Sequence, residues 1–226
     1  MVTSVKLAVA ALAVAVTMPA SAATLVSEFG SDATFAAPTT GLSNFTVFDF
    51  NSAAIPAGFT ADYPLEGSAE LVSGSLDLQY QQPAFSDGSQ YLAVKANGSA
   101  TITSTSGGYN SVSFFIGSID GYNTVDVLNT AGVVIGSYTN DAFTTPFEAN
   151  GDGSSSITNR RVTITAGAND GLIGSIRFGT GANSLEVDNL VFAVPEPSTW
   201  LMMLAGFGMV GMAMRARRRR MNVVFA

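Results

Sequence analysis

The sequence predicts an all-β protein, an antiparallel jelly-roll-like β-sandwich, flanked in the precursor by an N-terminal signal helix and a single C-terminal transmembrane helix. Short runs of aromatic and β-branched residues recur along residues 23–193, separated by Gly, Asn, Ser and Asp. No window in this body keeps the apolar period of an amphipathic helix. The body is also long enough to bury the core of one domain.

About nine or ten short strands at this spacing are typical of a sandwich or barrel. The segment 111–119 is almost entirely apolar, which predicts a central strand buried on both faces. Asn97-Gly98 is a common hairpin turn and predicts that the strands on either side of it pair with each other. Residues 53–67 and 140–159 read as loops, because Pro, Gly and Asn interrupt them. The predicted strands are 44–50, 69–80, 90–95, 99–104, 111–119, 123–129, 133–138, 161–166, 174–178 and 184–193.

Residues 1–22 form a predicted secretory signal peptide. Lys6 gives its start a positive charge, and residues 7–16 are an unbroken apolar run. Ala20 and Ala22 supply the small side chains that precede a signal-peptidase cut. The Sec translocon and signal peptidase are therefore expected partners. The alternative is a retained N-terminal membrane anchor.

Residues 194–220 combine a Pro-Glu-Pro break, an uncharged apolar segment and a cluster of arginines. From Trp200 to Met214 the apolar segment is fifteen residues long, short of the ~20 of a full membrane crossing. Trp200 suits the headgroup region, however, and the arginines can snorkel to the other side. The positive-inside rule then places the arginines in the cytoplasm and the body outside the inner membrane. The arginines of this membrane stop are Arg215, Arg217, Arg218, Arg219 and Arg220.

Pro195-Glu196-Pro197, Trp200, the Gly-rich apolar span and the Arg cluster follow one another in the order of the PEP-CTERM sorting signal, which this end closely resembles in its PEP-x-x-W form. The resemblance covers only the C-terminal segment. It implies a Gram-negative exported protein that a membrane-bound exosortase recognises at this motif and separates from its anchor. Residues 221–226 form a short tail past the point where such signals usually stop. The alternative is an ordinary C-terminal anchor with a chance Pro-Glu-Pro.

The body resembles the lectin-like jelly-roll domains that are common in exosortase-dependent surface proteins. The segments that carry this resemblance are 87–94, 111–120, 122–123 and 185–192. The resemblance implies a sheet arrangement in which the early strand near Asp49 and the final strand near Asp188 are neighbours. A shared fold does not by itself imply a function.

Composition excludes several kinds of chemistry. The chain has no His and no Cys, so His- or Cys-dependent nucleophiles, His or Cys zinc sites and disulfides are excluded. The body has four basic side chains against sixteen acidic ones, a net charge of −12. This charge argues against nucleic-acid and anionic-membrane partners and is compatible with Ca²⁺ or neutral glycans. The glutamates of the body lie in unrelated surroundings and do not suggest a glycosidase pair: Glu28, Glu66, Glu70, Glu148 and Glu186.

Calcium is the one metal that the side chains favour. Counting by twos along the final strand places Asp188 on the same face as Leu190 and Phe192, where a bare carboxylate would be costly. Asp49, between two phenylalanines, is the matching acid on the early strand. These two acids predict a structural Ca²⁺ site. The alternative is a bulge at residues 188–189 that turns the acid to solvent.

Sugar binding usually needs an exposed aromatic ring with polar neighbours. The body has no Trp, but Tyr109 and Tyr122 lie in loop-like surroundings. Asn123 and Asp120 flank Tyr122 and could complete a polar cluster, although a turn needs the same residue types. Tyr109, Tyr122 and Asn123 are therefore candidate ligand residues, with a place in the core or rim as the alternative.

The sequence as a whole predicts a non-enzymatic exported protein of the cell surface or of an exopolysaccharide matrix, sorted by an exosortase through its C-terminal signal. A second hypothesis is a carbohydrate-binding module that recognises polysaccharide with the help of Ca²⁺. A third, a secreted glycoside hydrolase, is disfavoured by the absence of His and by the scattered glutamates.

Overall fold

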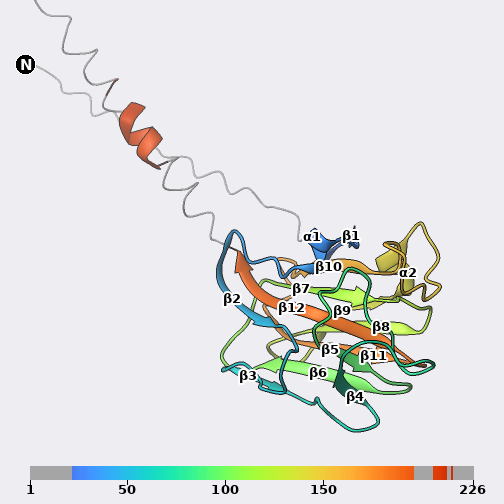
Figure 1. Ribbon diagram of the computed structural model, residues 1–226. Coiled ribbons are helices and arrows are strands. Elements are labelled where there is room, and N and C mark those ends of the chain that lie inside the picture. Colours follow the sequence, from blue (N-terminus) through green and yellow to red (C-terminus); the bar gives the residue numbers. More distant parts are fainter. Residues whose placement is uncertain (1–21, 196–205, 213–214, 216–226) are drawn as a thin grey trace, which may run out of the picture.

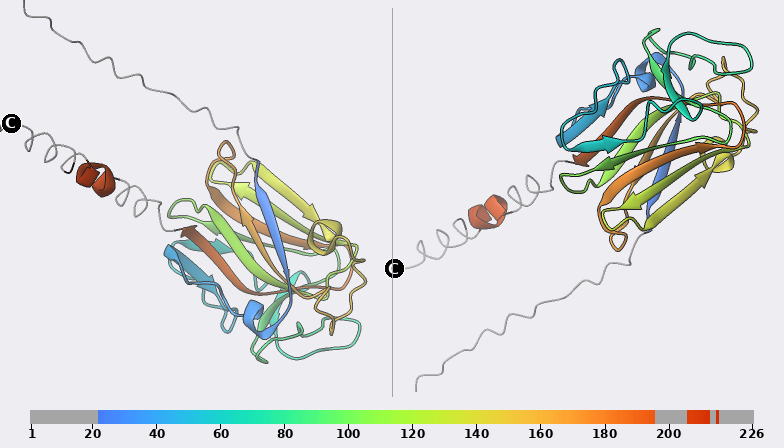
Figure 2. Two further views of the ribbon diagram at one scale, coloured as in Figure 1. Left: turned by 90° about the horizontal axis from the view of Figure 1, so that it is seen from above. Right: turned by 90° about the horizontal axis from the view of Figure 1, so that it is seen from below.

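The computed structural model describes residues 22–195, 206–212 and 215. In this part of the chain, two antiparallel sheets pack face to face as a β-sandwich (Figure 1), which confirms the predicted all-β fold. Figure 2 shows the two layers and the twist between them from above and from below.

The first sheet contains seven strands: β1 (Thr24–Phe29), β2 (Leu42–Phe48), β4 (Ala69–Val72), β5 (Tyr91–Val94), β7 (Ser111–Gly117), β10 (Arg160–Thr165) and β12 (Leu185–Pro195). Their order is β1-β10-β7-β12-β5-β4, and β2 pairs with the second half of β12. The pairing of β2 with β12 confirms that the early and final strands are neighbours.

The second sheet contains five strands: β3 (Phe59–Ala61), β6 (Ser99–Ser104), β8 (Asn123–Asn129), β9 (Val134–Thr139) and β11 (Ile173–Thr180). Their order is β3-β6-β11-β8-β9. Two short helices, α1 (Asp32–Phe35) and α2 (Asn140–Thr144), lie between strands. The sequence did not predict them, because one turn is too short to show a helical period; α1 is fixed by a capping box between Ser31 and Thr34.

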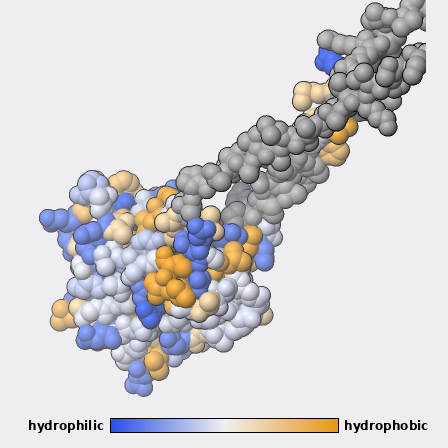
Figure 3. Space-filling view, turned by 180° about the vertical axis from the view of Figure 1, so that it is seen from behind, coloured by the Kyte–Doolittle hydropathy of each residue, from blue (hydrophilic) through white to orange (hydrophobic). Residues whose placement is uncertain are grey.

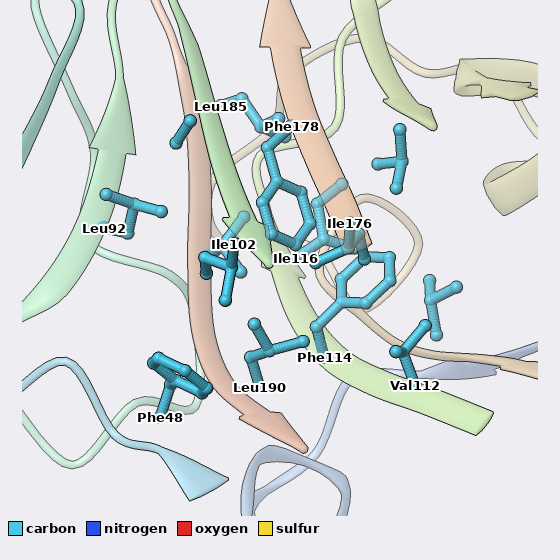
Figure 4. Packing of buried hydrophobic residues seen from close by; sticks show 14 of the residues in the cluster. Phe48, Leu92, Ile102, Val112, Phe114, Ile116, Ile176, Phe178, Leu185 and Leu190 are labelled. Carbon is cyan, nitrogen blue, oxygen red and sulfur yellow. The ribbon is translucent and has the colours of Figure 1, made fainter. Parts of the chain in front are cut away.

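The core fills the space between the two sheets (Figure 4). Alternate residues of β7 point into it, and the ring of Phe114 meets that of Phe178 on β11 edge-to-face at 5.1 Å. The other face of β7 is also covered, because Phe35 of α1 packs on Phe115 at 5.1 Å. Every residue of β7 is buried, as the apolar sequence of this segment predicts.

Two predictions about strands were wrong. Asn97-Gly98 forms a turn, but the strands on either side of it belong to different sheets, so they do not form a hairpin. The predicted strand 69–80 ends at Val72, and its second half is a tight turn closed by an isolated bridge between Leu76 and Tyr80. Leu78 lies at the tip of that turn with a φ of +60°.

The surface of the sandwich is mainly polar. Figure 3 shows one face, on which hydrophobic residues occupy a limited area among hydrophilic and near-neutral ones. Exposed apolar side chains on the sandwich include Val26, Phe29, Phe45, Leu78 and Phe147. The rings of Phe29 and Phe147 contact each other edge-to-face at 5.8 Å. Exposed apolar side chains of this kind are normal for a folded domain.

Candidate functional site

Strand β12 carries the domain into the predicted sorting motif. Along its length β12 pairs with β7 on one side, and on the other side it pairs with β5 and then with β2. The last pair in the ladder joins Pro195 to Leu42. The remaining motif residues, Glu196, Pro197 and Trp200, lie outside the described residues. The central strand of the sheet therefore ends on the first residue of the motif.

The chain enters and leaves the sandwich at the same end of the first sheet. Thr24 lies opposite Thr165, Thr165 lies opposite Ser111, and Ser111 lies opposite Ala193. Three strand spacings, about 14 Å, separate the start of β1 from the end of β12 in this row. The two positions can be followed in Figure 2.

The predicted signal peptide and anchor fall largely outside the described residues. Ala22 is exposed two residues before β1, whereas Ala20 is not described. Residues 206–212 and Arg215 are helical, and residues 207–212 and Arg215 are exposed. None of the helices formed by the described residues combines the length and the hydrophobicity that a membrane crossing requires. Four arginines of the membrane stop are not described: Arg217, Arg218, Arg219 and Arg220.

A polar cleft lies at the opposite end of the first sheet from the two chain ends. Its volume is about 440 Å³. The turn of residues 75–81 forms one wall, and Ser118, Asp120, Ser184 and Glu186 lie on the sheet side. Hydroxyl, amide and carboxylate groups dominate this lining. The cleft therefore offers several hydrogen-bonding groups to a polar ligand.

Glu186 closes the floor of the cleft and is fully buried. Its carboxylate accepts hydrogen bonds from the hydroxyls of Ser118 and Ser184 and from the backbone N–H of Gln81 at 3.0 Å. Burial nevertheless raises the pKa of Glu186 to about 7, because the three donors only partly replace water. With both oxygens engaged and no exposed surface, this carboxylate holds the wall of the cleft to the sheet.

The predicted cluster around Tyr122 forms beside the cleft. The Tyr122 hydroxyl lies 2.6 Å from Oδ2 of Asp120 and 2.7 Å from the carbonyl oxygen of Asn183, both of which line the cleft. Asn123 is fully buried and accepts from the Asp120 N–H at 2.7 Å. Its side-chain amide also donates to the backbone carbonyl of Ser184, at 3.2 Å. Tyr122 thus positions a cleft residue, and Asn123 is part of the scaffold behind it.

Tyr109 lies in the core, so it does not fit the prediction of a ligand residue. Only 7% of its surface is exposed, and its ring stacks on Phe59 at 5.7 Å and meets Phe192 at 5.4 Å. Its backbone is bridged to Ile173. The alternative reading of Tyr109, a place in the core, is the one that the structure shows.

Asp188 is buried, but not on the face that was predicted. A bulge at Asn189, where φ is +48°, shifts the register between Asp188 and Val191, so Asp188 and Leu190 point to opposite faces of the sheet. The bulge of the alternative prediction is therefore present, yet it does not bring the acid to solvent, since Asp188 is 1% exposed. Asp49 lies on the exposed surface beyond the end of β2.

The surroundings of Asp188 do not provide a set of metal-ligating side chains. Among the residues that the structure describes, no three His, Cys, Asp or Glu side chains gather closely enough to hold a metal ion. Oδ1 of Asp188 accepts from the Asn189 N–H at 2.6 Å, whereas Oδ2 has no hydrogen-bond partner within the described chain. Burial is the main cause that raises the pKa of Asp188 to about 7, and the charges of Asp87 and Asp49 add to it.

Sequence reasoning missed two parts of this architecture. The cleft depends on residues 75–81, which alternate like a strand but form a turn. The side chain of Arg161 donates four hydrogen bonds to backbone carbonyls of distant segments. Neither has a local sequence signal, because both depend on contacts between distant segments.

Several solved structures are weakly similar to the chain. A mutant of CBM29-2, a family 29 carbohydrate-binding module, is 15% identical with a TM-score of 0.36, covering 68% of this chain and 94% of its own. A family 6 carbohydrate-binding module is 10% identical with a TM-score of 0.35, covering 66% and 94%. CsCBM6-3 from Clostridium stercorarium, solved in complex with cellobiose, is 16% identical with a TM-score of 0.34, covering 60% and 86%. Similarities this weak carry no information about ligands.

No curated protein matches the chain. Its C-terminal segment, in contrast, matches a known sorting signal. Residues 193–219 match the PEP-CTERM protein-sorting motif, so the match begins inside β12 and ends within the Arg cluster, at Arg219. The chain therefore carries a PEP-CTERM sorting motif, which indicates an exported protein processed at the cell envelope.

Proposed function

We propose that this chain is a non-enzymatic surface or matrix protein, exported through the Sec translocon and processed by an exosortase. In this proposal signal peptidase removes residues 1–22, and the C-terminal helix holds the precursor in the inner membrane with the Arg cluster in the cytoplasm. The exosortase then separates the sandwich from its anchor. The released body joins the cell surface or an exopolysaccharide matrix.

The observation that carries this proposal is the direct passage of β12 into the matched motif. Up to Pro195 the chain is hydrogen-bonded into the first sheet, with β2 beside it. A processing enzyme needs an extended, accessible backbone, which a central strand does not offer. We therefore infer that the bond cut by the exosortase lies beyond Pro195 and that the sandwich keeps all of β12.

Intact-mass analysis of the protein from a host with an exosortase tests this inference. The expected species begins after Ala22, ends beyond Pro195 and lacks the Arg cluster. Deletion of the exosortase gene should leave a species that retains the cluster. A mature chain that ends upstream of Pro195, or that keeps Arg215–Arg220 in the exosortase-containing host, contradicts the proposal.

Paired variants show whether the motif itself is read. Glu196→Ala combined with Trp200→Ala should abolish trimming, because both residues belong to the PEP-x-x-W pattern. Ser198→Ala combined with Thr199→Ala changes two residues between them and should be trimmed normally. If the first variant reaches the same mass and destination as the unaltered chain, the sorting hypothesis is wrong.

A second candidate function is carbohydrate binding in the cleft. Its polar lining, with the partly exposed Asp120 held by Tyr122, suits the hydroxyl groups of a neutral glycan. The buried Glu186 is not a candidate acid for hydrolysis, because none of its surface is exposed.

Glycan-array screening followed by calorimetry on each hit tests this candidate. The unaltered protein should bind a neutral polysaccharide, and Asp120→Ala should weaken binding at least about tenfold. Asp32→Ala, an exposed acid on α1, is the matched control and should bind normally. Retained matrix association without any array signal would favour a purely structural role. Sugar release that is lost in one glutamate variant would instead revive the hydrolase hypothesis.

A further inference from the structure

Arg161 makes an unusual set of hydrogen bonds on the outer face of the first sheet. Its Nε donates to the carbonyl of Thr34 at 2.8 Å, and Nη1 donates to that of Asn189 at 2.9 Å. Nη2 donates to the carbonyls of Phe35 and, at 3.0 Å, Ala36. We call these four acceptors the carbonyl cage. All three guanidinium nitrogens are thereby satisfied by backbone oxygens.

The cage joins segments that are far apart in the sequence. Three of its oxygens come from the end of α1, where helix termination leaves carbonyls without intrahelical partners. The fourth comes from the bulge residue next to Asp188 on β12. Arg161 itself is on β10 and lies opposite Phe115, which in turn lies opposite Asp188. One side chain therefore ties α1 to two strands of the sheet.

The guanidinium of Arg161 is a buried positive charge beside the carbonyl cage. Arg161 is 3% exposed. Burial lowers the pKa of its guanidinium to about 10, so the group stays charged at neutral pH. The opposite charges that act on it are those of Asp188 and Glu28, of which the buried Asp188 has the larger effect. A cation in contact with backbone carbonyls and close to a carboxylate is the arrangement that a bound Ca²⁺ would also adopt. Here the four carbonyl oxygens already have Arg161 as their donor, whereas Oδ2 of Asp188 has no hydrogen-bond partner within the described chain.

We propose that the Arg161 guanidinium is the resident cation of this face and that it, rather than a metal ion, holds α1 to β10 and β12. A planar guanidinium suits this role because its donors diverge in fixed directions and can reach several carbonyls at once. Asp188 then acts on the buried positive charge through its electrostatic field, without an ion pair and without ligating a metal. This proposal is independent of how the C-terminal motif is processed.

Thermal unfolding of the purified protein with and without metal is the first test. The melting temperature should be the same in EDTA and in millimolar CaCl2 at matched ionic strength. A melting temperature that rises by several degrees in Ca²⁺, with the rise abolished by Asp188→Asn, would overturn the proposal.

Variants of the two neighbouring arginines provide the second test. Arg161→Gln should lower the melting temperature by about 10 °C, because four carbonyls lose their donors and the buried Asp188 loses the favourable field of the guanidinium. It should also speed amide hydrogen exchange in residues 31–37. Arg160→Gln is the matched control: Arg160 is adjacent and equally buried, but donates to Ile157 at 2.7 Å and lies over the Phe29 ring at 4.1 Å. It should leave exchange in residues 31–37 unchanged.

If Arg161→Gln does not fold, Arg161→Lys provides the same comparison, because it keeps the charge and loses the planar fork. Faster exchange in residues 31–37 than in the Arg160→Gln protein is then expected. Exchange in these residues at the wild-type rate in the folded Arg161 variant would show that the guanidinium does not hold α1, and would refute the proposal.

Discussion

At the scale of single residues, the buried carboxylate of Glu186 couples the cleft to pH. Its pKa is raised from 4.5 to about 7, chiefly by burial, and that of Asp188 is raised in the same direction. A carboxyl group whose pKa is higher in the folded than in the unfolded state binds its proton more tightly when folded. The stabilisation by that proton is complete below about pH 4.5 and is lost as the pH rises towards 7.

We therefore predict that the free energy of unfolding decreases between pH 5 and pH 8. Each unit of pKa difference corresponds to about 1.4 kcal/mol, which sets the scale of the loss per group. Urea unfolding monitored by circular dichroism at both pH values measures it. The pKa values of Asp126 and Glu70 are lowered in the folded protein, so these two groups add stability as the pH rises. They do so at pH values below the range from 5 to 8.

Glu186→Gln should flatten this pH dependence, since the amide does not titrate: its oxygen can accept from Ser184 and Gln81, and its NH2 can donate to the Ser118 hydroxyl oxygen. Glu66→Gln changes an exposed glutamate and should leave the dependence as in the unaltered protein. A stability that rises from pH 5 to pH 8, or an equal slope in the Glu186→Gln protein, would show that burial does not control this carboxyl group.

At the scale of elements, the clearest sequence signals belong to strands whose environment is uniform. Strand β7 is buried on both faces, so an unbroken apolar run suffices to predict it. Edge strand β1 alternates only weakly between half-buried and exposed residues, and β3 spans three residues beside Pro56 and Gly58. These two strands depend on partners that lie 41 or more positions away in the sequence, and no local pattern specifies such partners.

The candidate site shows the same limit. The motif at residues 195–200 is a linear signal, and the sequence alone identified it. The position of Asp188 could not be predicted by counting, because one left-handed residue, Asn189, reverses the alternation of the strand. The carbonyl cage of Arg161 and the cleft wall both depend on the tertiary structure.

The bulge itself is therefore expected to be sensitive to substitution. At Asn189, a φ of +48° is tolerated by Asn and Gly but strains Ala, and the side-chain amide donates to the Phe35 carbonyl at 3.0 Å. Asn189→Ala should lower the free energy of unfolding by about 2 kcal/mol, the sum of strain and a lost hydrogen bond. Asn189→Gly should lower it by about 1 kcal/mol. Urea unfolding of the two proteins gives both values, and an Ala variant as stable as the Gly variant would contradict the role of backbone strain.

At the scale of the whole molecule, the sandwich has two functionally different ends. The chain enters at Thr24 and leaves near Ala193 at one end of the first sheet. The cleft lies at the other end, around Glu186, seven residues earlier on β12 and hence about 23 Å away along the strand. In a precursor held by its C-terminal segment, the cleft would face away from the membrane.

The absence of cysteine makes this orientation measurable, because one introduced thiol is the only thiol in the chain. Leu78→Cys places it on the cleft wall, where the side chain is 86% exposed, and Asn169→Cys places it on the exposed loop after β10, next to the chain ends. In spheroplasts without exosortase, a bulky maleimide should modify Leu78→Cys as fast as it does in the detergent-solubilised precursor. Asn169→Cys should react several-fold more slowly in the spheroplasts, because the membrane surface obstructs a bulky reagent there. If the cleft thiol is the slower of the two before solubilisation, the domain is oriented differently and the cleft is not presented outwards.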